Sequence, residues 1–300
     1  EVIIPDFTYP ATAQAVYLVG ATPVIVDVNK ETYCIDYNEI EKAITDKTKV
    51  IMPVSEFGNP LDYEKLNIIK EKYNLFIVED AACSIGAMHD NNKVGSFADI
   101  SCFSLHPRKV ITTGEGGMNT TNNDELAKKM NSIKHFGMEM DTDRHEIVFN
   151  RKIATNYKLS NILGAIGKEQ LKKIEKIVNT KLQLAKNYNK LLESTNLLTA
   201  PLVSKEARHT YQTYCTYLNK KGIRNKLIKE LKQFGIETQI GTYALSLQPA
   251  FKDTKQIGNL KISHNLFNNT LALPMANDLT YEDQRFIVEK IIETINNIEV

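Results

Sequence analysis

The sequence predicts an α/β fold, with a mostly parallel central sheet covered by helices on both faces and a smaller C-terminal α+β domain. Strand-like and helix-like segments alternate from Val2 to Val78, which is typical of such a sheet. The last third changes to a strand pattern of alternating aromatic and Thr residues, beginning at Tyr211. The 300 residues, 42% hydrophobic and 24% charged, are enough for one large domain or two unequal ones.

The first half of the chain supplies the elements of the central sheet. Apolar and β-branched runs predict strands at Val2–Ile4, Pro23–Val28, Val50–Val54, Leu75–Val78, Ile100–Phe103 and Met118–Thr121. Composition and periodicity predict helices at Ala11–Leu18, Tyr37–Thr45, Asp62–Tyr73 and Asp124–His135. Asp36 is expected to cap the second of these helices. The segment Asp141–Arg151 is polar and charged, and we expect an exposed loop there.

The second half starts with helical periodicity from Ile162 to Leu192, which fits one long helix or two and is expected to join the two domains. Further strands are predicted at Tyr211–Leu218 and Ile236–Ile240, and helices at Asn225–Phe234 and Tyr281–Ile295, the last capped by Thr280. We therefore expect a large domain over 1–165, a connecting helical region over 166–195 and a small domain over 196–300.

Composition and missing motifs exclude several classes of protein. A net charge of +1 argues against a nucleic-acid surface, and no apolar run has membrane-spanning length. No signal peptide is visible, so we expect a cytoplasmic protein. The four cysteines are far apart, which suggests neither a disulfide framework nor a zinc site. The sequence lacks the glycine-rich motif of dinucleotide-binding folds, the P-loop, H-E-x-x-H and G-x-S-x-G.

The stretch SCFSLHPRKVITTGEGG, from Ser101 to Gly117, predicts a reactive lysine. Lys109 follows a buried strand that Pro107 ends, and a Thr- and Gly-rich turn comes next. The glycines allow another group to approach the backbone closely. A lysine with a lowered pKa, here beside Arg108 or His106, is a nucleophile that attacks carbonyl groups. The alternative is an ordinary solvated lysine.

Asp80 follows the strand Leu75–Val78, at the edge of the sheet where ligands bind in such folds. A carboxylate there can pair with a cationic ring nitrogen of a bound heterocycle. The alternatives for Asp80 are a helix cap or a buried salt-bridge partner. His89 and His106 are candidate acid–base groups, although a single histidine is more often a surface or core residue.

Six segments in this order resemble the DegT/StrS family: PDFTYPATAQAV, GATPVIVDV, VEDAACSIGA, SCFSLHPRKVITTGEGG, TNYKLSNILGAIG and LALPM. The resemblance covers nearly the whole chain. It implies a pyridoxal-phosphate (PLP)-dependent aminotransferase of the aspartate-aminotransferase fold, which is fold type I, acting on nucleotide-linked keto-sugars.

The resemblance also implies a role for each site residue. Lys109 falls on the lysine that binds PLP and moves the proton, and Asp80 falls on the aspartate that pairs with the pyridine nitrogen. Ser104 matches a serine that contacts the cofactor phosphate. Tyr9 matches an aromatic residue that stacks on the cofactor ring, and Thr8 beside it is expected to face the site. Asn156 matches an asparagine that reaches the partner's cofactor phosphate, so a homodimer with shared active sites is expected.

Three features depart from the family pattern. Cys83 stands where a Gln or His usually contacts the cofactor, and a thiol is a weak hydrogen-bonding group. Lys158 replaces the usual Arg of the N-Y-R motif, which keeps the charge but loses the forked geometry. The chain opens directly on an apolar strand, so we expect that an N-terminal segment is missing and that PLP retention suffers.

The function expected from this resemblance is transfer of an amino group from L-glutamate to a nucleotide-linked keto-sugar. The H-P-R-K-x-x-T-T-G-E-G-G version of the lysine motif favours the branch acting at C4, and therefore a 4-keto-6-deoxy sugar. One alternative is a PLP- or pyridoxamine-phosphate-dependent sugar dehydratase of the same family, against which Lys109 argues. The other is a non-catalytic, dimerising or regulatory homologue. The products expected in such pathways are polysaccharide, glycan or antibiotic sugars.

Overall fold

The computed structural model describes residues 1–298 of the chain. Its main sheet is mostly parallel, and only the β8–β9 pair is antiparallel. In spatial order its strands are β17 (Lys255–Gln256), β3 (Pro23–Val26), β1 (Val2–Pro5), β4 (Val50–Ile51), β5 (Phe76–Asp80), β8 (Ile100–Ser104) and β9 (Gly117–Thr120). The predicted α/β architecture with a mostly parallel sheet is confirmed.

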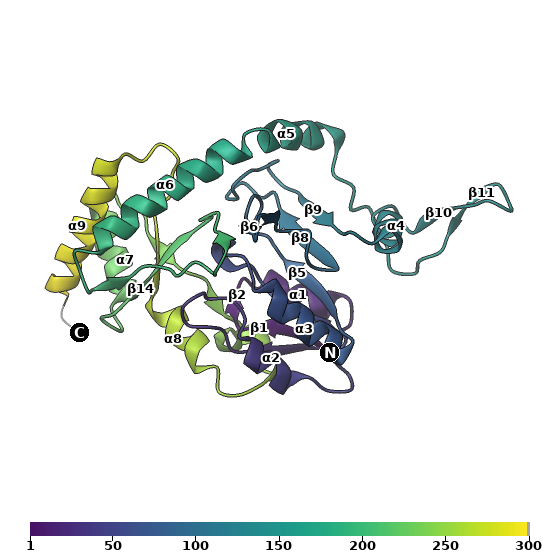
Figure 1. Ribbon diagram of the computed structural model, residues 1–300, viewed down its shortest axis with the longest axis horizontal. Helices are drawn as coiled ribbons and strands as arrows, with labels where there is room; N and C mark the ends of the chain where they lie inside the picture. The colour runs from purple at the N-terminus through teal and green to yellow at the C-terminus, as the bar shows by residue number, and fades with distance from the viewer. Residues whose placement is uncertain (299–300) are drawn as a thin grey trace.

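Helices cover this sheet, and capping side chains set where several of them begin. They are α1 (Ala11–Leu18), α2 (Tyr37–Ala43) and α3 (Tyr63–Tyr73). A fourth helix, α4 (Asp124–Ile133), follows β9 and lies to the right of the sheet in Figure 1. The Asp36 carboxylate accepts a hydrogen bond from the Asn38 amide at 2.9 Å, which confirms the predicted cap of α2. The apolar side of the sheet packs against α2 and α3 in a core that includes Ile3, Ile51 and Ile77.

The helical region after the sheet consists of two helices. These are α5 (Asn161–Leu171) and α6 (Ile174–Leu192), separated at Lys172 and Lys173. They run along one side of the molecule in Figure 1. α6 buries an apolar stripe that includes Val178, Leu184 and Tyr188, whereas α5 buries no residue within this chain.

The segment expected to be a loop is a β-hairpin instead. Its strands are β10 (Met138–Asp141) and β11 (Glu146–Phe149), which pair antiparallel and extend away from the body beyond α4 in Figure 1. Ile147 and Phe149 carry the strand alternation, which the many charged neighbours obscured in the sequence. The prediction of exposure is confirmed, since both side chains are exposed, but the prediction of a loop was wrong.

The last third of the chain builds a separate antiparallel sheet. Its strands in spatial order are β12 (Leu198–Thr199), β14 (Tyr214–Leu218), β18 (Thr270–Leu273) and β15 (Gln239–Ile240). It packs on α6, α7 (Arg224–Gln233) and α9 (Tyr281–Asn297) around a core that includes Leu227, Leu271 and Ile291. Thr280 caps α9 in a capping box with Asp283, as predicted. Strand β14 begins three residues later than predicted, at Tyr214.

Short elements tie the last third to the rest of the molecule. Helix α8 (Lys261–Asn269), the 3-10 turns η2 (Leu245–Leu247) and η3 (Pro249–Phe251), and strand β17 were not predicted. β16 (Tyr243–Ala244) pairs with β2 (Phe7–Thr8), and β13 (Ala207–Arg208) pairs with β6 (Met88–His89), which also pairs with β7 (Asn92–Lys93). The domain limits at 165 and 195 stay a prediction.

Candidate active site

The carboxyl ends of β4, β5 and β8 lie side by side because these three strands are parallel neighbours. Asp80 is the last residue of β5, and Ser104 is the last residue of β8. The register pairs Asp80 with Cys102, which lies two residues before Ser104. Lys109 follows β8 by five residues. The structure therefore brings Asp80, Ser104 and the Lys109 segment to one edge of the sheet.

Lys109 is half-buried and points toward the loop that follows β5. Its Nζ atom lies 3.2 Å from the Sγ atom of Cys83 and donates a hydrogen bond to it. The Lys109 backbone N–H donates to the His106 carbonyl at 2.9 Å, which holds the turn that carries the side chain. Burial raises the pKa of the Cys83 thiol to about 11, so the lysine amine faces a neutral thiol at neutral pH.

The turn after Lys109 is held closely against β8. The Leu105 amide donates to the Gly116 carbonyl at 2.9 Å, and the Thr112 hydroxyl donates to the Leu105 carbonyl at 2.9 Å. Gly116 has a φ angle of +156°, and a Cβ atom there would lie 2.7 Å from the Thr113 hydroxyl oxygen. Gly116 therefore serves the packing of the turn itself.

Asp80 is held in place by two hydrogen bonds to its carboxylate. The Ala82 amide donates to Oδ1 at 3.1 Å, and the Thr12 hydroxyl donates to Oδ2 at 2.8 Å. Thr12 lies in α1, and its hydroxyl is 3.2 Å from that of Thr8 in β2. Thr8 is thus connected to Asp80 through Thr12, a link that no sequence pattern indicated.

Glu79, the neighbour of Asp80, points to the opposite face of the sheet, as alternation along a strand requires. Its carboxyl is fully buried and accepts hydrogen bonds from Tyr63 at 2.7 Å and Ser101 at 2.8 Å, and a further one from Ser55. Burial raises the pKa of Glu79, while these hydroxyl groups lower it. Glu79 therefore holds β5 through buried hydrogen bonds on one face of the sheet, whereas Asp80 lies on the opposite face.

Sequence reasoning missed a second buried carboxyl group at this edge. Glu56 opens the 3-10 turn η1 (Glu56–Gly58), five residues after the end of β4, and it is 5% exposed. Its pKa is raised to about 8, because burial and the nearby Asp80 carboxylate raise it more than the Lys109 ammonium group lowers it. Glu56 stands at the end of the predicted strand Val50–Val54 and before the Gly58 turn, so the same strand-end rule that indicated Asp80 would have found it.

The other candidates lie at different distances from this cluster. Tyr9 is 58% exposed, and its ring centroid is 6.3 Å from that of Tyr243 in β16. The Ser104 hydroxyl oxygen accepts a hydrogen bond from the His106 amide at 3.3 Å. Ser104 lies at the sheet edge that also carries Asp80, and the roles of Tyr9 and Ser104 toward a cofactor stay predictions.

Asn156 is not brought to Lys109 within this chain. It is exposed, and its backbone forms a bridge with His135 after α4. Its side-chain oxygen accepts only a local hydrogen bond, from the Lys158 amide at 3.4 Å. The Lys158 Nζ atom lies 5.2 Å from the Phe136 ring centroid, so this lysine is engaged by an aromatic face.

Among residues 1–298, neither candidate histidine forms a hydrogen bond with the Lys109 amine. His89 packs against the rings of Tyr63 and Phe97, at centroid distances of 5.5 and 5.9 Å. His106 is partly exposed, and its Nδ1 atom accepts a hydrogen bond from the Arg108 amide at 3.2 Å. In this structure the two side chains have local packing and turn-forming roles.

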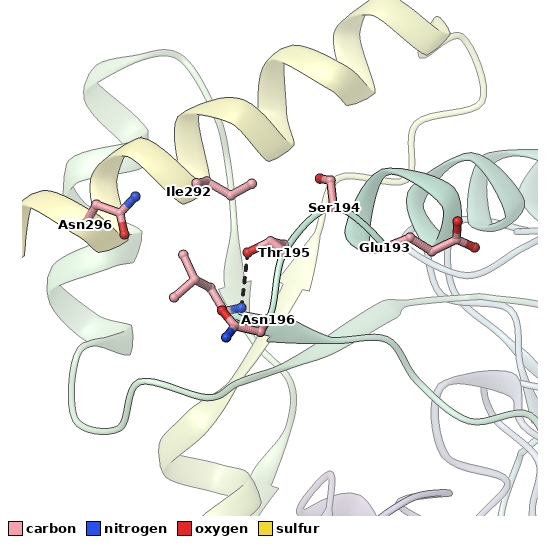
Figure 2. Close-up of a pocket in the computed structure, with 7 residues that line it drawn as sticks. Glu193, Ser194, Thr195, Asn196, Ile292 and Asn296 are labelled. Atoms are coloured by element: carbon pink, nitrogen blue, oxygen red, sulfur yellow. Dashed lines mark hydrogen bonds between the residues drawn. The ribbon is translucent and has the colours of Figure 1, made fainter.

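A shallow hollow lies on the opposite part of the molecule, between the end of α6 and helix α9 (Figure 2). It is lined by Glu193, Ser194, Thr195, Asn196, Leu197, Ile292 and Asn296. The Thr195 hydroxyl there accepts a hydrogen bond from the Leu197 amide at 3.1 Å, which is a local turn contact. Only Glu193 among these residues is charged, so the hollow offers no catalytic group.

Comparison with known proteins assigns the chain to a family. The model of the DegT/DnrJ/EryC1/StrS aminotransferase family matches residues 1–292. The chain belongs to this family. It is 34% identical over 303 residues to GDP-perosamine synthase of Caulobacter vibrioides, with 100% of this chain and 79% of the relative covered.

Two solved structures show the same fold. A DegT/DnrJ/EryC1/StrS aminotransferase from Brucella abortus is 32% identical, with a TM-score of 0.89, over 98% of this chain and 79% of the other. The PLP form of Spr1654 from Streptococcus pneumoniae is 26% identical, with a TM-score of 0.91, over 100% and 81%. The predicted family and the PLP-dependent transferase fold are confirmed.

The enzyme class and the cofactor follow from the family. Its members are PLP-dependent sugar aminotransferases, so the predicted class of enzyme and the predicted cofactor, PLP, are confirmed. The side chains at the sheet edge fit this cofactor, because an amine at Lys109 and a carboxylate at Asp80 approach one space from neighbouring segments. No helix within residues 1–298 combines the length and the apolar character needed to cross a membrane.

Proposed function

We propose that this enzyme transfers the amino group of L-glutamate to the ketone of a nucleotide-linked 4-keto-6-deoxy sugar. The observation that carries the proposal is the half-buried Lys109 amine, which is 3.2 Å from Cys83 and lies at the same sheet edge as Asp80. The name of the Caulobacter relative, GDP-perosamine synthase, supports a sugar linked to a nucleotide. A cytoplasmic location stays a prediction.

Each residue at the edge has a distinct proposed role. Bound PLP supplies the group that accepts and returns the amino nitrogen. The Lys109 amine binds the cofactor and then moves the proton at the reacting substrate carbon. Asp80 holds a proton on the ring nitrogen through ion pairing, and Thr12 keeps its carboxylate oriented. Ser104 binds the phosphate, whereas Tyr9, Thr8 and Cys83 border the ring.

We propose that the active unit is a homodimer in which Asn156 completes the partner's site. Asn156 is exposed and is not brought to Lys109 of its own chain. The adjoining helix α5 buries no residue, although Ile162 is 76% exposed and Leu171 is 52% exposed. Apolar side chains exposed along a helix in this way indicate an interface. A second copy of the chain packed against α5 would cover these side chains, and it would also bring Asn156 to the cofactor phosphate of the partner.

A mixing experiment tests the shared site. The Lys109→Ala and Asn156→Ala variants should each be inactive as pure dimers. When they are mixed after dissociation, each mixed dimer has one intact site, and about a quarter of wild-type activity should return. No recovery on mixing would place Asn156 in the site of its own subunit or outside the site, and would contradict the composite arrangement.

The two alternative functions are less well supported. The sugar dehydratases of this family use His in place of the lysine, whereas this chain has Lys109, whose amine lies 3.2 Å from the Cys83 sulfur. A non-catalytic homologue has no need to keep Lys109, Asp80 and Ser104 together at one edge. Transamination is therefore the activity that we propose.

The decisive experiment is trapping of the cofactor. The purified chain, incubated with PLP, should show a visible absorption band, and borohydride reduction should attach the cofactor to the peptide that contains Lys109. Addition of L-glutamate should remove the band, and a 4-keto-6-deoxy nucleotide sugar should restore it. The variant Lys93→Ala, at an exposed lysine, serves as the matched control. Label spread over surface lysines only would reject the assignment.

A further inference from the structure

The short segment 209–213 joins β13 to β14 and was partly predicted to be strand, but it forms no strand. Two of its side chains donate hydrogen bonds to distant carbonyl groups instead. The Thr210 hydroxyl donates to the Cys83 carbonyl at 3.0 Å, in the loop after β5. The Gln212 amide nitrogen donates to the Arg108 carbonyl at 2.5 Å, in the turn after β8. This segment therefore reaches both loops of the proposed site.

Gly58 makes the contact of Thr210 with the Cys83 loop possible. The Thr210 amide donates to the Gly58 carbonyl at 3.1 Å, so the segment is also held by its main chain. A Cβ atom at Gly58 would lie 2.0 Å from the Thr210 hydroxyl oxygen and 2.8 Å from the Cys83 carbonyl oxygen. Gly58 also has a φ angle of +95°, which favours glycine. Because Gly58 has no side chain, Thr210 can join the turn η1 to the loop after β5.

The orientation of the Gln212 amide is set by its partner. The Arg108 carbonyl can only accept a hydrogen bond, so the NH₂ group of Gln212 must face it. The Gln212 Oε1 atom is buried and has no hydrogen-bond partner among residues 1–298. A flip of the amide would place this oxygen against the carbonyl oxygen and lose the existing hydrogen bond. The hydrogen bonding of Gln212 is therefore directed at the main chain one residue before Lys109.

The residue between Thr210 and Gln212 has an uncommon backbone conformation. Tyr211 has a φ angle of +49°, in the left-handed region that bulky residues rarely occupy. Its ring stacks on the buried His209 ring at a centroid distance of 4.1 Å, and its amide donates to the His209 Nδ1 atom at 2.8 Å. Backbone strain persists where surrounding contacts hold it, and it is frequent at functional sites. The conformation of the segment is therefore fixed by contacts within this chain.

We propose that Thr210 and Gln212 are positioning residues that hold the Lys109 amine beside Cys83. Thr210 fixes the main chain on the Cys83 side of this contact, and Gln212 fixes it on the Lys109 side. The 3.2 Å between the Lys109 Nζ and Cys83 Sγ atoms is therefore set by the part of the chain that leads into the small antiparallel sheet. The effect on catalysis rests on the role proposed above for Lys109, whereas the effect on the two loops does not.

Amide hydrogen exchange of the full chain, measured without PLP, tests the hold on each loop separately. Gln212→Ala should speed exchange of the Lys109 amide, which donates to the His106 carbonyl in the same turn. Thr210→Val keeps the size of the side chain but loses the hydroxyl, so it should speed exchange of the Ser84 amide in the other loop. Each change should be about two- to twelvefold, the range that corresponds to one hydrogen bond.

Matched variants separate these local effects from a general loss of stability. Thr210→Ser keeps the hydroxyl, so the loop after β5 should exchange at the wild-type rate. Gln212→Glu places a carboxylate oxygen opposite the Arg108 carbonyl and should speed exchange of the Lys109 amide more than Gln212→Ala does. Gln239→Glu, the same change at an exposed position of β15, should not. Wild-type exchange in both loops of Thr210→Val and Gln212→Glu would overturn the proposal, and so would equal acceleration throughout the chain.

The rate at which PLP attaches to Lys109 tests the effect on the amine. Borohydride trapping at successive times should show slower attachment in Thr210→Val and Gln212→Glu, and the wild-type rate in Thr210→Ser. In turnover, kcat should fall in the same variants while the KM for the nucleotide sugar stays nearly unchanged, because neither side chain is proposed to touch the sugar.

Attachment at the wild-type rate in both Thr210→Val and Gln212→Glu would overturn the positioning role. If PLP does not label Lys109 in the wild type, the proposed function is rejected, and the exchange data still decide whether segment 209–213 holds the two loops.

Discussion

Around Asp80 the polar side chains are buried and hydrogen-bonded to one another, whereas along α5 the apolar side chains face solvent. Thr8 and Thr12 are nearly fully buried and connect to the Asp80 carboxylate within the same chain. Ile162 and Leu171 on α5 have no such partners, and α5 buries no residue. The surroundings of Asp80 are therefore packed and hydrogen-bonded within a single chain, whereas the apolar side chains of α5 are not covered within it.

The comparison distinguishes the part of the proposed site that one chain builds alone from the part that we expect a second chain to complete. The floor formed by β2, β4 and β5 takes its geometry from main-chain pairing and buried hydrogen bonds, so its groups are placed without a ligand or partner. The outer side depends on groups that are exposed in this chain, such as Asn156 and Tyr9. Substitutions in the floor should therefore change the chemistry, whereas substitutions on α5 should change assembly.

The largest effect is expected in the floor, for Lys109→Ala. Loss of its proton transfer alone should lower turnover by about 10²- to 10⁴-fold, and loss of cofactor attachment should abolish it. The side chain is only half-buried, so the melting temperature should stay close to that of the wild type. Steady-state turnover and thermal unfolding, measured beside Lys93→Ala, check this. Turnover like that of the wild type would remove Lys109 from the chemistry.

Asp80→Asn should have the next largest effect. It keeps the shape of the side chain but removes the charge that pairs with the ring nitrogen. Truncating one partner of a buried charge pair costs about 2–5 kcal/mol, which corresponds to about 30- to 5,000-fold in turnover. The cofactor should still attach to Lys109, so trapping serves as the internal control. Near-normal rates with Asn at this position would contradict the proposed role of Asp80.

On the exposed region, Ile162→Glu should weaken association without changing the chemistry of assembled dimers. Burying an isoleucine side chain contributes about 1.5–3 kcal/mol, so the dimer should dissociate at concentrations at least about tenfold higher than the wild type does. Light scattering across a dilution series measures this. Ile68→Glu on α3, also at an exposed isoleucine, is the matched control. Equal dissociation of the two variants would show that α5 is not the interface.

The smallest effect is expected for Cys83→Ser, a substitution opposite the Lys109 amine in the proposed cofactor site. The hydroxyl replaces a weak acceptor opposite the Lys109 amine with a stronger one. A hydrogen bond contributes about 0.5–1.5 kcal/mol net, so cofactor affinity should rise by about two- to twelvefold. Equilibrium dialysis with PLP measures the change. An unchanged or weaker affinity would show that this contact does not limit cofactor retention.

Local patterns predicted most of the helices and strands because their periodicity and caps are encoded within a few residues. α1 has the predicted bounds, and the caps at Asp36 and Thr280 are present with the expected hydrogen bonds. The strand β17 and the hairpin β10–β11 were missed. Two-residue strands such as β17 exist only because a distant strand pairs with them, and charged neighbours concealed the alternation of the hairpin.

The site was predictable where a residue follows a strand in a recognisable motif, as Asp80 and Lys109 do. Glu56 has the same position after a strand, but no family motif drew attention to it. The Thr8–Thr12–Asp80 connection was not predictable, because it joins side chains that are 68 residues apart in the sequence. Side-chain rotamers and the packing of α1 on the sheet decide that contact.

The fold class, the family and the cofactor could be predicted from the sequence alone, because each of them is carried by periodicity or by motifs of contiguous residues. The assignment of Lys109 as the reactive lysine stays a prediction. The positions of the carboxyl groups relative to one another come from the three-dimensional structure. Glu79 and Asp80 are neighbours in the chain, yet strand alternation places them on opposite faces of the sheet. Glu56 and Asp80 are 24 residues apart, yet parallel pairing brings their segments together, and only Glu56 becomes nearly fully buried.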